Sequence, residues 1–94
     1  MKAPIDPDRF ARFAEAYRTG LREAVRKGGG YFLRPGESPD DYAARTAERM
    51  LAAIQSKNLS SVHVAGDGFR NACKALGIKF GREHLRAYLE GSDG

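Results

Sequence analysis

Apolar residues recur three and four positions apart in four separate stretches of this 94-residue chain, which predicts four amphipathic helices. We place these helices at about residues 7–27, 39–56, 68–76 and 82–90. A chain of this length is expected to form one domain. The predicted fold is therefore all-α, a small four-helix domain over residues 1–94 whose last two helices form a C-terminal helical hairpin.

The first helix has clear start and stop signals. Asp6 is a candidate N-cap, Pro7 suits the first helical position, and Gly28-Gly29-Gly30 ends the helix. Gly20 interrupts the apolar stripe at a cost of about 1 kcal/mol relative to Ala, so it marks either a close helix crossing or a local weakness. The stripe comprises Phe10, Phe13, Ala14, Tyr17, Leu21, Ala24 and Val25.

The second helix has an equally clear start. Ser38 is a candidate N-cap and Pro39 fits the first helical position. Asp40 and Asp41 follow in the first turn, where acids favour the positive end of the helix dipole. The stripe facing the core comprises Tyr42, Ala43, Thr46, Ala47, Met50, Leu51 and Ile54.

Two linkers are read less directly. Residues 31–33, Tyr-Phe-Leu, are expected to be extended over the core or to form a mobile flap, and Pro35-Gly36 predicts a turn. Residues 59–66 fit a loop, a single helical turn or a short strand, because Val62-His63-Val64 alternates but has no obvious partner strand.

The last two helices are defined by a turn between them. Asp67 is expected to cap the third helix, and Gly77 followed by Ile78 predicts a Schellman ending. The side chains expected inward are Phe69, Ala72, Cys73 and Leu76 from the third helix and Leu85, Tyr88 and Leu89 from the fourth.

Composition and charge narrow the class of protein. Hydrophobic residues make up 41% and charged residues 30%, which suits a globular domain and not a disordered one. The net charge of +4 favours acidic partners, either nucleic acid or an acidic protein surface. No stretch approaches the roughly 18 apolar residues that cross a bilayer. The N-terminal run lacks the apolar core of a signal peptide and the chain has one cysteine, so we expect a reducing cytoplasm.

Catalytic groups are sparse. His63 and His84 have no further ligands at metal-binding spacing. Cys73 lies on an apolar face, where a small core residue is the favoured interpretation over a histidine-activated nucleophile. The glycine clusters lack the strand and the Gly-Lys-Ser/Thr ending of a phosphate loop. We therefore expect no enzyme, no metal and no cofactor.

The C-terminal hairpin carries the candidate contact surface. Arg70 and Lys74 lie one turn apart on the outer side of one predicted helix, and Arg82 and Arg86 do so on the next. Such cations neutralise phosphates, and an arginine can reach guanine in a major groove. The full candidate set is Arg70, Lys74, Lys79, Arg82, His84 and Arg86.

The run from Ala72 to Ile78, followed by Leu85 and Tyr88-Leu89, resembles the helix-turn-helix family. The resemblance implies that the fourth helix enters the major groove, although the connection from Gly77 to Gly81 exceeds the roughly 3–4-residue turn of that motif. The same segment is similar to short uncharacterised proteins of bacteria and their phages, which implies a mobile-element setting.

Two functional hypotheses follow. The first is a small non-enzymatic nucleic-acid-binding or regulatory protein that uses the basic hairpin, with a homodimer face on the first helix at Phe10, Phe13 and Tyr17. The alternative is a protein-binding module or inhibitor, of phage origin, that acts on a host nucleic-acid-associated complex. A plain structural hairpin with a solvated charged face accounts for the same pattern.

Overall fold

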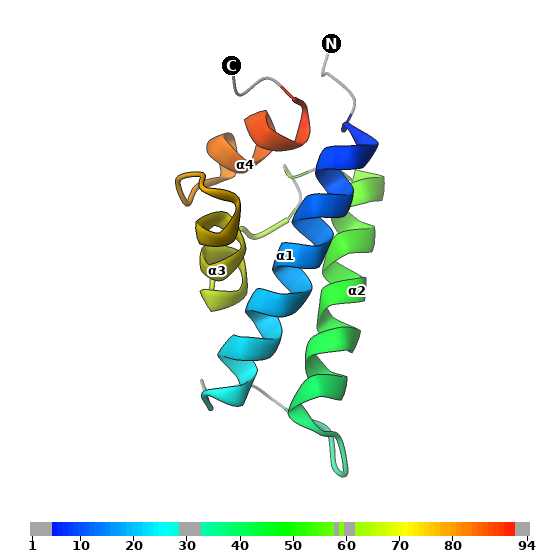
Figure 1. Ribbon diagram of the computed structural model, residues 1–94. Coiled ribbons are helices and arrows are strands. Elements are labelled where there is room, and N and C mark those ends of the chain that lie inside the picture. The colour runs from blue at the N-terminus through cyan, green and yellow to red at the C-terminus, as the bar shows by residue number, and fades with distance from the viewer. Residues whose placement is uncertain (1–4, 29–32, 58, 60–61, 92–94) are drawn as a thin grey trace.

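The computed structural model describes residues 5–28, 33–57 (for residue 57 the backbone alone), 59 and 62–91. The fold is all-α, as predicted, and the described residues contain no strand. Each helix begins and ends within one residue of the position that the apolar pattern predicts. The helices are α1 (Pro7–Arg26), α2 (Pro39–Lys57), α3 (Asp67–Leu76) and α4 (Arg82–Leu89), shown in Figure 1.

Helix α1 is the centre of the fold. In Figure 1 it runs between α2 on one side and α3 on the other, while α4 lies across the end at which α1 begins. The backbone N–H of Asp6 donates to the carbonyl oxygen of Leu89 at 2.8 Å, which joins the start of α1 to the end of α4. Helix α3 packs extensively on α1, and α4 contacts α1 over a smaller area. Helices α3 and α4 make few direct contacts with each other.

Buried apolar side chains from all four helices form one core. The rings of Phe13 and Tyr17 lie with their centroids 5.7 Å apart, and Phe69 of α3 packs against both, 4.8 Å from Tyr17. Phe13 and Tyr17 are almost completely buried, and Phe10 is partly buried. The expectation that Phe13 and Tyr17 present a dimer face is therefore wrong, because the core of a single chain covers both rings.

Local hydrogen bonds explain where the helices begin and end. The Asp6 side chain accepts the N–H of Arg9 at 3.2 Å, and the Ser38 hydroxyl accepts the N–H of Asp41 at 3.1 Å, so both predicted caps are confirmed. Asp67 is not a cap as expected, because it is already the first residue of α3 and Gly66 occupies the cap position.

The predicted Schellman ending of α3 is confirmed. Gly77 has φ 72°, its N–H donates to the carbonyl of Lys74 at 3.2 Å, and the N–H of Ile78 donates to that of Cys73 at 3.0 Å. This left-handed residue reverses the chain after α3 and directs residues 78–81 away from the helix axis.

The linkers differ in how closely they follow expectation. The Pro35-Gly36 turn is confirmed, with φ 78° at Gly36 and a closing bond from the Glu37 N–H to the Arg34 carbonyl at 2.9 Å. Leu33 is 44% exposed and so does not lie over the core as expected, while Tyr31 and Phe32 fall outside the described residues. Residues 62–66 have no helix or strand, and Val62 is buried.

Helices α1 and α3 lie close together at Gly20. A Cβ added there would lie 2.7 Å from the Cβ of Asn71 and 3.2 Å from the carbonyl oxygen of Gly68. A Cβ on Gly68 would in turn lie 3.1 Å from the side chains of Tyr17 and Leu21. Of the two interpretations of Gly20, the close helix crossing is the observed one. This crossing fixes α3 on α1 and leaves the opposite side of α3 to solvent.

No helix in the described part of the chain is long and apolar enough to span a bilayer.

Candidate nucleic-acid interface

The outer side of α3 carries two exposed cations and an aromatic ring. Arg70 and Lys74 are both exposed, one helical turn apart, as their spacing predicts. The guanidinium carbon of Arg70 lies 4.6 Å from the centroid of the Phe80 ring, a cation–π contact. Phe80, in the turn after α3, is 37% exposed. Helical spacing does not identify Phe80 as part of this surface, because the residue lies in the turn between α3 and α4.

Lys79 and His84 extend this surface past the turn. Both are exposed, and Lys79 immediately precedes the Phe80 ring in the chain. The His84 Nε2 atom lies 4.0 Å from a carboxylate oxygen of Glu83, a contact that is ionic only when the imidazole is protonated. Glu83 itself is almost completely solvent-exposed at the first turn of α4 and adds a negative charge there.

Arg82 and Arg86 do not form the outward pair that the helical wheel predicts. Both are half-buried. An amino group of Arg82 donates a hydrogen bond to the backbone carbonyl of Leu59, which ties α4 to the segment after α2. The Nε atom of Arg86 is buried and has no hydrogen-bond partner among the described residues. These two arginines therefore face the protein at least in part, and their guanidinium groups are not free in the way that major-groove reading requires.

The exposed cations on α3 and the following turn have no acidic partner among the described residues. The ion pairs of 2.8–2.9 Å within the described residues join Arg18 to Glu48, Arg26 to Asp40 and Arg45 to Glu37. All of these lie on α1, α2 and the linker between them. None of Arg70, Lys74 and Lys79 forms an ion pair with a described residue. We call the set Arg70, Lys74, Lys79 and Phe80 the α3 surface.

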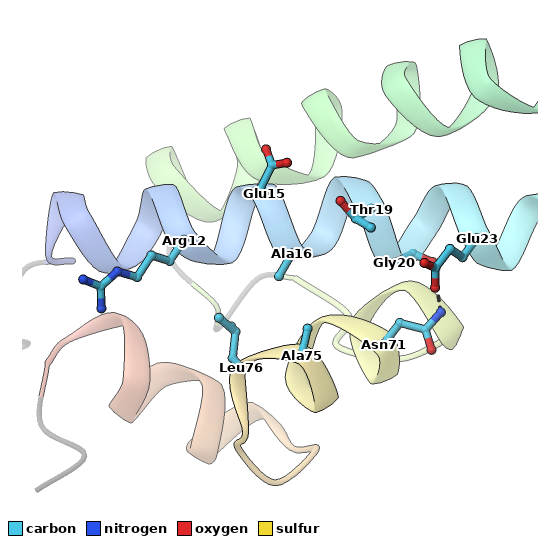
Figure 2. Close-up of a pocket in the computed structure, with 9 residues that line it drawn as sticks. All are labelled: Arg12, Glu15, Ala16, Thr19, Gly20, Glu23, Asn71, Ala75 and Leu76. Carbon is cyan, nitrogen blue, oxygen red and sulfur yellow. Dashed lines mark hydrogen bonds between the residues drawn. The ribbon is translucent and has the colours of Figure 1, made fainter.

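A groove of about 410 Å³ lies between α1 and α3, and none of the residues of the α3 surface lines it. Figure 2 shows Ala16 of α1 facing Ala75 and Leu76 of α3 across it, with Asn71 at one end and Arg12 at the other. The groove has an apolar floor and a rim of mixed charge. The described residues contain no group of three metal-ligating side chains there or elsewhere. The remaining lining residues are Glu15, Thr19, Gly20 and Glu23.

Cys73 is a core residue, in agreement with the favoured interpretation of its spacing. Its side chain is 1% exposed on the inner side of α3. Burial raises the pKa of the Cys73 thiol, and a hydrogen bond from the Gly81 backbone only partly offsets that effect. A buried neutral thiol is a poor nucleophile.

No family model, curated protein or solved structure matches this chain. The resemblance of residues 72–89 to the helix-turn-helix family, and to short bacterial and phage proteins, therefore stays a prediction. The longer connection that distinguishes this chain from that motif is present as residues 77–81, between the end of α3 and the start of α4.

Proposed function

We propose that this protein binds nucleic acid through the α3 surface and acts as a small non-enzymatic regulator. The observation that supports this most is the exposure of Arg70, Lys74 and Lys79 on one continuous segment, without ion pairs to described residues. Unpaired cations on a rigid helix attract a polyanion because each phosphate contact releases condensed counterions. The packing of α3 on α1 supplies the rigidity.

The structure changes the role proposed for the fourth helix. Arg82 holds the Leu59 carbonyl and Arg86 is half-buried, so we assign both to positioning α4. The proposed contact with nucleic acid is then made by α3 and the turn that follows it, and His84 lies at the margin of this surface. Under this proposal the protein contacts mainly phosphates, which position a nucleic acid without reading its sequence.

Salt-dependent binding provides the test. Fluorescence anisotropy would measure the affinity of the whole protein for labelled oligonucleotides over a range of salt concentrations. The double variant K74A/K79A is expected to bind more weakly, with a slope of log K against log salt smaller by about 1.4 if both lysines contact a single strand. The control R34A/R49A removes the same charge from exposed positions away from α3 and is expected to retain the wild-type slope.

The alternative is an acidic protein partner held by the same cations, because net positive charge favours either. A pull-down from bacterial lysate with and without nuclease distinguishes them. Material that the wild-type protein captures and K74A/K79A does not is expected to disappear after nuclease treatment. Retention of a protein through that treatment would favour the alternative.

A further inference from the structure

The α3 surface combines exposed cations with an exposed aromatic ring, and this combination narrows the class of nucleic acid. We infer that the ligand is single-stranded, and that Phe80 and Arg70 form a platform on which an unpaired base stacks. The inference rests on the proposed function, because it assumes that the α3 surface contacts nucleic acid.

The first observation is the position of Phe80. It and Leu33 are the exposed large apolar side chains among the described residues, and of the two Phe80 is the one on the α3 surface. The Phe80 ring is not part of the core. Its partner is the guanidinium of Arg70, at 4.6 Å from the ring centroid. The Phe80 ring is therefore available for contact with a ligand and contributes little to the hydrophobic core.

The second observation is the pairing of two flat groups. A guanidinium is planar and stacks on aromatic faces, so contact with Phe80 restricts the orientation of Arg70 on the helix. Bases stack on aromatic rings and on arginine planes alike, whatever their sequence. Lys74 and Lys79 lie near this pair in the chain and supply charge for the adjoining phosphates. Stacking platforms flanked by cations are the usual components of single-strand recognition.

The third observation disfavours a duplex. A helix that reads the major groove uses free side chains near its N-terminus. At the N-terminus of α4, the Arg82 side chain is instead hydrogen-bonded to the Leu59 carbonyl. The next residue is Glu83, whose exposed carboxylate repels phosphates. Bases in a duplex are already stacked on each other and do not offer a face to Phe80. The available groups therefore suit a strand whose bases are open.

The experiment compares three labelled probes of equal length with the full chain: an oligothymidine strand, an abasic strand with the same phosphates, and a duplex. The wild-type protein is expected to bind oligothymidine more tightly than the abasic strand by about 5- to 150-fold for one stacked base. It is also expected to prefer oligothymidine to the duplex. F80A should abolish the preference for oligothymidine over the abasic strand, and F80Y should retain it.

The controls separate stacking from charge and from folding. L33A removes the other exposed apolar side chain and should leave all three affinities unchanged. R70K keeps the charge but loses the planar group, and should reduce the preference for oligothymidine. Circular dichroism confirms that each variant is folded.

The outcomes are distinct. Equal affinity for oligothymidine and the abasic strand, or tighter binding of the duplex, overturns the single-strand inference and leaves nucleic-acid binding in place. Absence of binding to every probe overturns both. A preference for oligothymidine that persists in F80A assigns stacking to another site and also overturns the inference.

Discussion

The side-chain amide of Asn71 donates a hydrogen bond of 3.0 Å to the backbone carbonyl oxygen of Gly20. This bond joins α3 to α1 at Gly20, where the two helices lie too close for an added Cβ. It directs the buried side of α3 onto α1, and so leaves Arg70 and Lys74 on the solvent side. The orientation of the α3 surface thus depends on Gly20, a residue without a side chain in the interior of α1.

The Gly20 crossing predicts a large effect for a small substitution. G20A places a methyl group 2.7 Å from the Cβ of Asn71 and 3.2 Å from the Gly68 carbonyl oxygen, so α3 has to shift. Overpacking of this kind costs about 1–3 kcal/mol, against a gain of about 1 kcal/mol in helix propensity. We expect a net decrease in the free energy of unfolding, measured by urea denaturation.

The neighbouring residue supplies the control for this prediction. Thr19 is exposed on the same helix, so T19A should change the free energy of unfolding by no more than about 0.5 kcal/mol. Stabilisation by G20A would show that the two helices are not in close contact there.

A second prediction concerns pH. Hydrogen bonds from the Arg45 side chain, at 2.9 and 3.0 Å, and from the Arg34 backbone N–H lower the pKa of Glu37 from 4.5 to about 2. Because the folded state favours the ionised carboxylate, its stabilising contribution is present above about pH 4.5. That contribution is lost as the pH falls toward about 2.

Substitution of Glu37 isolates this contribution. E37Q should be less stable than the wild type at neutral pH, and its stability should fall less on acidification between pH 4.5 and about 2. E48Q removes the exposed carboxylate that pairs with Arg18 and should retain the acid-side decline due to Glu37. Thermal unfolding followed by circular dichroism across this pH range measures both variants. Parallel curves for E37Q and wild type would contradict the assignment.

Arg82 is predicted to contribute to the stability of the fold and not to contact nucleic acid directly. R82A removes a charged donor from the Leu59 carbonyl and should lower the free energy of unfolding by about 1–3 kcal/mol. K74A, at an exposed position without an ion pair to a described residue, should change it by no more than about 0.5 kcal/mol. Urea denaturation of both variants decides the matter. If R82A left the stability unchanged but weakened oligonucleotide binding, Arg82 would instead be a residue that contacts the nucleic acid.

The thiol of Cys73 is predicted to be unreactive in the folded protein. It is 1% exposed, and burial raises its pKa, so both access and thiolate formation are restricted. Alkylation by a maleimide at neutral pH should be much slower in buffer than in concentrated urea. Comparable rates in the two conditions would show that the inner side of α3 opens readily.

The sequence predicts well those features that depend on neighbours in the chain. The Asp6 and Ser38 caps and the Schellman ending at Gly77 each involve residues within five positions, so their residue types identify them directly. The inward position of Cys73 follows from its helical spacing for the same reason.

Features that depend on contacts between residues far apart in the sequence could not be predicted from the sequence pattern. A helical wheel orders the faces of α4 but does not show that the Leu59 carbonyl, 23 positions earlier, lies within reach of Arg82. In the same way the wheel does not show that Phe69 packs over Phe13 and Tyr17 and completes their burial. The contact between Arg70 and Phe80 depends on the chain reversal at Gly77, which brings together residues on two sides of a turn.

The most direct test of the account is to locate the contact surface on the molecule itself. An NMR titration of ¹⁵N-labelled protein with oligothymidine would follow the backbone amides of the non-proline residues. We expect the largest shifts at Arg70, Lys74, Lys79 and Phe80, with the amides of α2 unchanged. Shifts confined to α2 or to the groove between α1 and α3, or no shifts at all, would contradict nucleic-acid binding by the α3 surface.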